Sequence, residues 1–360
     1  MTVVSRGDGM TYAPQGRAKP VVAPGDLPFA AVHLEHGHIY GMCNGLLEAG
    51  AELRSVYDPD PAKVDAFCKR FPGVRVARAL EEVLDDPDVR LVAAADVPNR
   101  RGPLGITVLA AGKDYFTDKA PFTTLEQLGD ARRAVAETGQ KYLVYYSERL
   151  HSECAVFAGD LIREGAIGRV VQVLGLGPHR LNAPSRPAWF FERQKYGGIL
   201  CDIGSHQIEQ FLTYTGAADA TVLSARTANF NHSGTPELED FGEASLRAEG
   251  GASGYFRVDW FTPDGLSTWG DGRTLILGTE GYLELRKYVD VARQAGGDHL
   301  YLVDSGGERY LELAGRVGYP FFGQLILDCL DRTEHSMTQA HAFKAAELCL
   351  KAQALAERSV

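Results

Sequence analysis

The feature that most constrains the fold is a regular alternation of strand-like and helix-like segments between residues 29 and 147. Short apolar runs typical of buried strands are each followed by a segment with the apolar spacing of a helix, and the connections are short. The strand-like runs are 29–34, 51–58, 74–77, 89–96, 113–119 and 141–147. This order predicts a parallel sheet with helices on both faces. Ligands of such sheets bind at the carboxyl ends of the strands.

The pattern changes after residue 147. Three pairs of strand-like runs are joined by glycine-containing turns, which predicts the hairpins of an antiparallel sheet. The turns lie at 249–251, 278–281 and 304–307, and they help to explain why the chain has 40 glycines in 360 residues. We therefore predict an arm over 1–28, a parallel α/β domain over 29–147, and an α+β domain over 148–360 that closes with helices at 321–332 and 338–357.

The net charge and the lack of targeting signals argue against several classes of partner and against secretion. The formal net charge of −10 gives no electrostatic reason to bind nucleic acid or an anionic membrane. No run approaches the ~18 apolar residues of a membrane span, and residues 1–20 lack the apolar core of a signal peptide. The six cysteines are scattered without a C-x-x-C pair, so we expect a reducing cytoplasm and no disulfide framework.

The segment HLEHGH at 33–38 follows the first strand, where a dinucleotide-binding protein carries G-x-G-x-x-G. Only Gly37 and Gly41 are present, so the glycine fingerprint is absent. Asp58 ends the second strand 21 residues after Gly37, close to the ~20 residues expected of the acid that binds the adenosine ribose. Such an acid favours NAD over NADP because it repels a 2′-phosphate. The alternative is a surface acid that starts a turn.

The same segment also allows a metal site. His33, His36 and His38 follow a strand, the last two in H-x-H spacing, and imidazole suits zinc. A metal-dependent hydrolase of this kind needs a barrel of repeated βα units with further ligands at later strand ends. The predicted hairpins count against a barrel, so our preferred interpretation includes no metal.

Two further segments carry groups suited to acid–base chemistry. Lys119 follows the fifth strand, where a lysine can polarise a hydroxyl or carbonyl oxygen. Asp202 and His206 lie four residues apart on a predicted helix that follows Gly197 and Gly198 and ends near Gly216, so they share one face. A carboxylate beside an imidazole raises its pKa and orients it, which suits a general acid or base. Taken singly, each of these features is more typical of a protein surface.

Together, these segments resemble the Gfo/Idh/MocA family of oxidoreductases from about residue 29 to residue 360. The matching motif residues are Asp118, Lys119 and Pro121 for the family's E-K-P, with Ala120 inserted, and Asp202 and His206 for its D-x-x-x-H. Further likeness lies at the strand-end Asp58 and at 110–121, 164–170, 197–211 and 278–285.

The resemblance implies a Rossmann-like domain that binds NAD(P), and a second domain whose large, open, mainly antiparallel sheet mediates a homodimer or homotetramer. It implies hydride exchange between the nicotinamide and a hydroxyl or carbonyl of a sugar, cyclitol or related polyol. His206 would take the hydroxyl proton, Lys119 would hold and polarise the oxygen, and Asp202 would orient the group. The three side chains would converge between the domains.

The predicted ligand contacts lie at the strand ends, in the loop over 177–198 and on the helix that follows this loop. We expect NAD rather than NADP to be held by Leu34, Glu35, His36, Gly37, His38, Ile39, Asp58, Pro98, Asn99 and Lys119. We expect the substrate to meet Arg149, His179, Trp189, Asp202 and His206. Two alternatives stay open: a metal-dependent hydrolase built on His33, His36 and His38, and a degenerate Rossmann scaffold that binds a sugar or a partner as a regulator.

Overall fold

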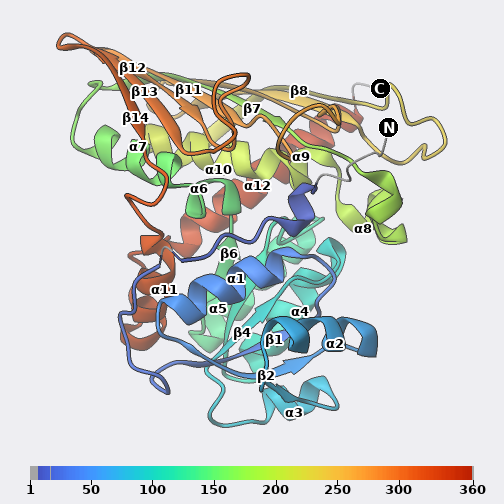
Figure 1. Cartoon of the computed structure of the whole chain (residues 1–360). Coiled ribbons are helices and arrows are strands. Elements are labelled where there is room, and N and C mark those ends of the chain that lie inside the picture. The colour runs from blue at the N-terminus through green and yellow to red at the C-terminus, as the bar shows by residue number, and fades with distance from the viewer. Residues whose placement is uncertain (1–6, 17, 359–360) are drawn as a thin grey trace. The chain divides into compact units, whose positions relative to one another are not determined.

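A computed structural model describes residues 7–16 and 18–358 of the chain (Figure 1). Contacts divide the described residues into two compact units. One, here called the Rossmann unit, contains residues 10–145 and 318–343. The other, here called the large-sheet unit, contains residues up to 9, then 146–317 and 344 onward. The predicted boundary at 147 lies two residues from the observed one, whereas 318–343 was predicted in the second domain and here joins the first.

The Rossmann unit is built on a six-stranded parallel sheet with the order β3-β2-β1-β4-β5-β6, which confirms the predicted parallel fold. Its strands are β1 (Pro28–Val32), β2 (Glu52–Tyr57), β3 (Arg75–Val76), β4 (Leu91–Ala94), β5 (Asp114–Asp118) and β6 (Tyr142–Tyr145). All residues of β4, β5 and β6 are buried, as expected for strands covered on both faces. The strand order reverses between β1 and β4, and ligands of such sheets bind at the carboxyl edge beside this switch point.

Helices follow the strands in turn. They are α1 (His38–Glu48), α2 (Pro61–Arg70), α3 (Leu80–Leu84), α4 (Pro98–Ala110) and α5 (Leu125–Thr138). Local sequence sets two of their starts: the Asp60 carboxylate accepts from the backbone amide of Ala62 at α2, and the Thr124 hydroxyl accepts from that of Gln127 at α5.

The late helix α11 (Pro320–Asp331) returns to the Rossmann unit. Its Phe322 ring occupies the space beside Gly45 of α1, where an added Cβ would lie 2.4 Å from the ring. The rings of Phe321 and Phe322 also lie 6.1 and 6.5 Å from that of Phe116 on β5. This aromatic contact explains why 318–343 groups with the first unit, although it follows the second in sequence.

The predicted arm is ordered over its described residues because it docks on α1. The Asn44 side-chain amide donates to the carbonyls of Ala13 and Pro14, each at 3.3 Å. The Val21 amide donates to the Ala49 carbonyl at 2.9 Å. A short 3₁₀ turn, η1 (Gly9–Thr11), begins this segment.

The large-sheet unit holds eight strands in the order β14-β13-β12-β11-β7-β10-β9-β8. They are β7 (Val170–Pro178), β8 (Ala220–Ala228), β9 (Phe241–Ala248), β10 (Ser253–Asp259), β11 (Arg273–Gly278), β12 (Gly281–Arg286), β13 (His299–Asp304) and β14 (Gly307–Glu312). The hairpins β9–β10, β11–β12 and β13–β14 confirm the three predicted turns, and the β7–β10 pair alone is parallel within this sheet as described. Strand β8 was not predicted; it is an edge strand on which only Thr227 is buried, so it lacks a clear apolar alternation.

The helices of this unit are α6 (Ser147–Leu150), α7 (Glu153–Arg163), α8 (Arg193–Tyr196), α9 (Ile199–Asp202) and α10 (Gly204–Thr215), with 3₁₀ turns η2 (Ala183–Ser185) and η3 (Ala188–Phe191). The long helix α12 (Gln339–Glu357) begins in the Rossmann unit and belongs to the large-sheet unit from Lys344 onward. Helices α7 and α10 run along one face of the large sheet (Figure 1). At Gly175 and Gly177 of β7, an added Cβ would lie 2.3 and 2.9 Å from the Gln207 side chain. These glycines therefore allow close approach of α10 to the sheet rather than a turn.

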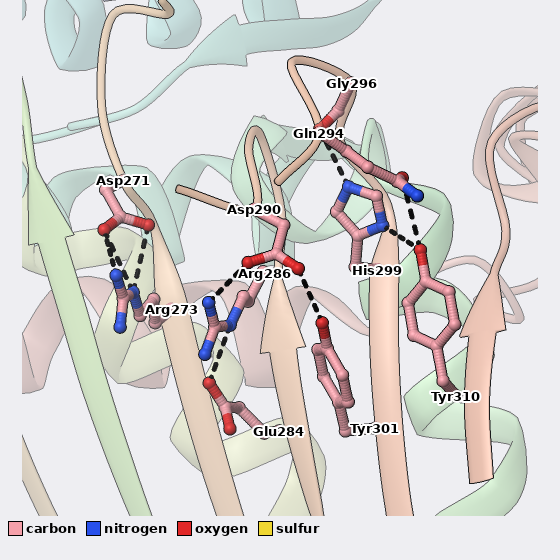
Figure 2. Close-up of polar contacts among 10 residues, drawn as sticks. All are labelled: Asp271, Arg273, Glu284, Arg286, Asp290, Gln294, Gly296, His299, Tyr301 and Tyr310. Carbon is pink, nitrogen blue, oxygen red and sulfur yellow. Dashed lines mark hydrogen bonds and ion pairs between the residues drawn. The ribbon is translucent and has the colours of Figure 1, made fainter. Parts of the chain in front are cut away.

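The opposite face of the large sheet is exposed and carries apolar side chains. Cross-strand rows include Leu275–Glu284–Tyr301–Tyr310 and Leu277–Tyr282–Val303. Figure 2 shows the polar contacts that accompany these rows: Asp290 lies 2.6 Å from Arg286 and accepts from the Tyr301 hydroxyl at 2.7 Å. Among residues 7–16 and 18–358, no helix is long and apolar enough to cross a membrane.

Candidate active site

Asp58, directly after β2, holds the loop that follows β1. Its Oδ2 accepts from the Leu34 amide at 2.6 Å, and its Oδ1 accepts from the Asp60 amide at 2.8 Å. The carboxylate is buried yet stands at the carboxyl edge of the sheet. Its position is therefore the one expected of an acid that accepts hydrogen bonds from an adenosine ribose.

The first residues of α1 meet the end of β5 in a buried charged network. His38 Nδ1 lies 2.9 Å from Asp118 Oδ1, and His36 Nδ1 lies 3.4 Å from Asp118 Oδ2. Arg101 of α4 is fully buried, with its Nη2 3.2 Å from the same Oδ2. Burial alone would raise the pKa of Asp118, but His38, Arg101 and His36 outweigh burial and hold that pKa well below its usual range. Burial and the neighbouring His38 lower the pKa of His36, which favours its neutral form.

The histidine trio of the alternative metal site does not assemble among the described residues. His33 turns instead toward Asp96, with Nδ1 3.4 Å from Oδ2. Within the described part of the chain, the one group with metal-ligand geometry is His36, His38 and Asp118, whose ligand atoms lie within 4.8 Å of one another. The Arg101 guanidinium already provides a positive charge on that carboxylate, which disfavours a second cation. With an open sheet in place of a barrel, the metal-dependent hydrolase is not supported.

The loop at 33–38 occupies the position of the glycine-rich turn in dinucleotide-binding proteins. His33 has a left-handed backbone, φ 50°, at the start of the turn where a glycine would be usual. The Glu35 carboxylate lies 2.5 Å from Lys63 Nζ, so its charge is neutralised. Gly37 precedes α1 without a side-chain cap, but the first backbone amides of the helix already have partners: the His38 amide donates to His36 Nδ1 and the Ile39 amide to the His36 carbonyl, each at 3.2 Å. The glycine-rich turn is thus replaced by a segment with three histidines. Their imidazoles lie in the turn where glycines would usually let the backbone approach a pyrophosphate.

A buried polar atom of α4 favours the binding of a dinucleotide. The Oδ1 atom of Asn99, in the first turn of α4, is buried and has no hydrogen-bond partner among residues 7–16 and 18–358. A buried amide oxygen without a partner suits a ligand group that donates a hydrogen bond. Pro98, Ile39 and Leu34 line the same strand ends and are buried. The chemistry of these residues is compatible with a dinucleotide, and their contact with one stays a prediction.

Lys119 follows Asp118 at the end of β5 and is 5% exposed. Its backbone carbonyl accepts a hydrogen bond from Arg101 Nη1, and the Lys119–Ala120 peptide bond is cis. Arg101 therefore links the β4 and β5 ends, since its Nε also donates to the Asp96 carbonyl at 2.7 Å. Sequence reasoning missed Arg101; its place one turn into the helix after a buried strand was the available signal.

Asp202 and His206 occupy two short helices rather than the single predicted helix. Asp202 ends α9 and Gly204 begins α10, with Ile203 between them. Both side chains are nearly buried, with Asp202 8% and His206 2% exposed. Both belong to the large-sheet unit and Lys119 belongs to the Rossmann unit. The convergence of the three side chains remains a prediction.

The large-sheet unit adds charged residues that the sequence did not single out. Glu148 of α6 accepts through Oε2 from Lys287 Nζ at 2.9 Å and from Gln207 Nε2 at 3.1 Å. His179, a predicted substrate contact, has its Nε2 3.8 Å from Glu148 Oε1. Glu148 lies beside the predicted Arg149, whereas Lys287 follows β12 without any motif.

The other predicted substrate residues have structural partners. Arg149 forms a two-pronged ion pair with Glu209, its Nε 2.8 Å from Oε1 and its Nη2 2.5 Å from the same oxygen. The Trp189 ring packs 5.9 Å from that of Phe190 and is 8% exposed. Arg149 is thus partly exposed and paired, whereas Trp189 is buried; contact of either side chain with substrate stays a prediction.

Comparison with known proteins identifies the family. Residues 35–146 match the model described as the oxidoreductase family, NAD-binding Rossmann fold, and residues 157–284 match the GFO/IDH/MocA C-terminal domain. The chain belongs to the GFO/IDH/MocA family of oxidoreductases. The predicted resemblance and fold class are thereby confirmed.

Several members of the GFO/IDH/MocA family are similar to this chain. It is 27% identical over 237 residues to scyllo-inositol 2-dehydrogenase (NAD(+)) of Bacillus subtilis strain 168, covering 64% of this chain and 65% of that protein. It is 28% identical over 171 residues to scyllo-inositol 2-dehydrogenase (NADP(+)) IolW of the same organism, covering 46% of each. The matched segments thus span about half to two thirds of these curated relatives.

Solved structures cover more of the chain. A putative oxidoreductase from Erwinia carotovora atroseptica SCRI1043 is 51% identical, with a TM-score of 0.89 over 92% of this chain and 98% of that chain. Levoglucosan dehydrogenase in complex with NADH and levoglucosan is 18% identical, with a TM-score of 0.76 over 93% of this chain and 98% of that chain, and shows the shared fold.

Proposed function

We propose that this GFO/IDH/MocA protein is an NAD(P)-dependent oxidoreductase that acts on a hydroxyl or carbonyl of a sugar, cyclitol or related polyol. The observation that carries the proposal is that Lys119, Asp202 and His206 all retain the family motif's residue types and are all nearly buried. Titratable side chains that match the family motif and are shielded from solvent are candidates for a chemical role. The named relatives that act on inositol, xylose and levoglucosan support the substrate class.

The proposed roles follow from the chemistry of each side chain. A bound nicotinamide supplies the hydride acceptor or donor. The His206 imidazole takes the hydroxyl proton during oxidation and returns it during reduction. The Lys119 ammonium donates to the same substrate oxygen, and the Asp202 carboxylate orients the reacting group. These roles require Lys119 and His206 to reach one substrate oxygen.

For the cofactor, we propose NAD in preference to NADP. The Asp58 carboxylate is fixed by two backbone amides, at 2.6 and 2.8 Å, and stands ready to accept from ribose hydroxyls. A 2′-phosphate at the same place would meet its negative charge. Relatives named for each cofactor exist, so the preference rests on Asp58.

We further propose a homodimer or homotetramer that forms through the exposed face of the large sheet. Side chains between 37% and 45% exposed on this face include Val171, Tyr255, Leu275, Leu277, Tyr282 and Tyr310. Contiguous apolar surface of this kind marks association sites. We place the protein in the reducing cytoplasm, and its six cysteines are free thiols.

The test is a screen of sugars, inositols and sugar acids with purified protein and each nicotinamide cofactor. Titration with NADH and NADPH, followed by protein fluorescence, is run in parallel. Binding of a cofactor with turnover of a polyol supports the proposal. Failure to bind either cofactor, with none copurifying, would favour the regulatory scaffold, because the glycine-rich turn is replaced by histidines in this chain.

A further inference from the structure

A buried charge pair within the large-sheet unit contacts the helix that carries the proposed proton acceptor. Glu148 is 2% exposed, and the Lys287 side chain is fully buried. Lys287 Nζ donates to Glu148 Oε2 at 2.9 Å, and Gln207 Nε2 donates to the same oxygen at 3.1 Å. Gln207 directly follows His206 on α10, so this carboxylate is tied to the helix that carries His206.

His179 completes this cluster from another side. Its Nε2 lies 3.8 Å from Glu148 Oε1, and that oxygen has no hydrogen-bond partner among the residues that the structure describes. Its Nδ1 lies 3.1 Å from the Gly177 carbonyl, and its ring lies 4.5 Å from that of Trp269. The cluster thus draws on α6, α10 and the residues after β7 and β12, and packing holds its members in place.

The carboxylate stays ionised in this setting. Burial would raise the pKa of Glu148, but Lys287, His206 and His179 together lower it to about 2. The effect of His206 on Glu148 is mutual, because two interacting charges shift each other. A negative charge is therefore fixed within electrostatic range of His206.

Stability alone does not account for such a pair. Replacing a buried ion pair by well-packed apolar side chains is often neutral or stabilising, so its presence is weak evidence of a stabilising role. The neighbouring pair Arg149–Glu209 already ties α6 to α10. Glu148 and Lys287 thus add charge rather than a missing link between these helices.

We propose that Glu148 and Lys287 are positioning residues that together set the proton affinity of His206. Glu148 favours the imidazolium, and Lys287 limits that effect by drawing on the same carboxylate. The inference rests on the proposed function only in giving His206 the proton-accepting role. The other charged groups of this region are Asp202 on α9, Glu209 on α10 with its partner Arg149 on α6, and His179 and Arg186 in the loop after β7.

The experiment follows the titration of His206 by NMR in full-length protein with labelled histidine. The His206→Gln variant identifies its resonance. Glu148→Gln removes a negative charge while keeping a hydrogen-bonding side chain, so the His206 pKa should fall by on the order of one unit. Lys287→Met removes the opposing positive charge, so the pKa should rise. Lys287→Arg keeps the charge and should restore the wild-type value.

Lys344 and Glu347 provide matched controls. They form an ion pair of 3.4 Å on α12 in the same unit. Lys344→Met and Glu347→Gln repeat the two charge changes outside the cluster and should leave the His206 pKa within a few tenths of a unit. The proposal would be overturned if Glu148→Gln and Lys287→Met shift the His206 pKa in the same direction. It would also be overturned if their shifts are no larger than those of the two control variants.

Two further measurements keep the outcome decisive. Where Glu148→Gln fails to fold, Glu148→Asp retains the charge, moves it away by one methylene and should lower the pKa by a smaller amount. The pH dependence of turnover should move with the NMR value for any active substrate. Opposite pKa shifts without polyol turnover would support the electrostatic inference and refute the proposed function, whereas turnover without those shifts would refute the inference alone.

Discussion

The proposed preference for NAD over NADP rests on the Asp58 carboxylate. Its carboxylate holds the loop after β1 through the Leu34 amide, and its charge is fixed at the carboxyl edge of the Rossmann sheet. We expect Asp58→Ser to raise the affinity for NADPH relative to NADH roughly tenfold, which is ~1.4 kcal/mol. Fluorescence titration with both cofactors measures the ratio.

Asp60 gives the control for this change. Its carboxylate accepts from the Ala62 amide and starts α2. Asp60→Ser should alter stability by no more than about 1 kcal/mol and leave the cofactor ratio unchanged. Equal ratios in wild type and Asp58→Ser would contradict a ribose-binding role for Asp58.

Glu148 predicts a pH dependence of stability. Its pKa is lowered from 4.5 to about 2 in the folded protein. Its contribution is therefore present above pH 4.5 and is lost as the pH falls toward 2. Chemical denaturation should show Glu148→Gln destabilised by about 3 kcal/mol at neutral pH, with the difference from wild type shrinking across this interval. A difference that stays constant with pH would show that the carboxylate charge does not stabilise the fold.

Some candidate site residues belong to local sequence patterns, whereas others come together only when the chain folds. Asp58, Lys119 and the Asp202–His206 pair lie in local patterns at strand ends or on a helix, and could be named from sequence. Glu148 and Lys287 are 139 residues apart, and only folding brings them together. Their pairing could not be predicted because no spacing rule connects α6 with the end of β12.

Most predicted strands have a buried face, and β4, β5 and β6 are buried throughout, whereas edge strand β8 lacks an apolar alternation. Strands β3 and β14 have no buried residue; β3 was predicted from the alternation of strands and helices, and β14 from the glycine turn that pairs it with β13. The break between α9 and α10 at Ile203 was missed because the apolar spacing continues across it. The role of glycine within β7 also became visible only with α10 packed on it.

Gly175 tests the contact between α10 and the large sheet. An added Cβ would lie 2.3 Å from Gln207 Oε1, so Gly175→Ala should displace that side chain and destabilise the protein by about 1–3 kcal/mol. Thermal and chemical unfolding measure the change. Gly250→Ala is the control, because an added Cβ at that turn meets nothing within 4 Å. Equal destabilisation by both would contradict close packing at β7 as the cause.

At the scale of the whole molecule, the order of residues along the chain differs from the composition of the two units. Residues 318–343 follow the large sheet along the chain but belong to the Rossmann unit through the aromatic contacts of α11. Only long-range packing reveals this return. The exposed sheet face is likewise a property of the assembled strands, since Leu275, Leu277 and Tyr282 come together by register.

Association through that face has a direct test. Leu275→Glu with Leu277→Glu places charges on the apolar rows and should convert the proposed oligomer to monomer in sedimentation velocity. Leu125→Glu changes a side chain that is 51% exposed on α5 and should leave the oligomer intact. A wild-type protein that sediments as a monomer, or a double variant that still associates, would contradict assembly through the large sheet.

The most direct test of the oxidoreductase assignment is the absorbance of reduced nicotinamide during reaction with a panel of polyols, in wild type, Lys119→Ala and His206→Ala. We expect wild type to reduce the cofactor with at least one sugar or cyclitol. Each variant should lose at least ~100-fold in turnover, because proton transfer and oxygen polarisation both fail, while cofactor binding persists. Full turnover in both variants would contradict the assigned site, and no turnover by wild type across the panel would contradict the proposed function.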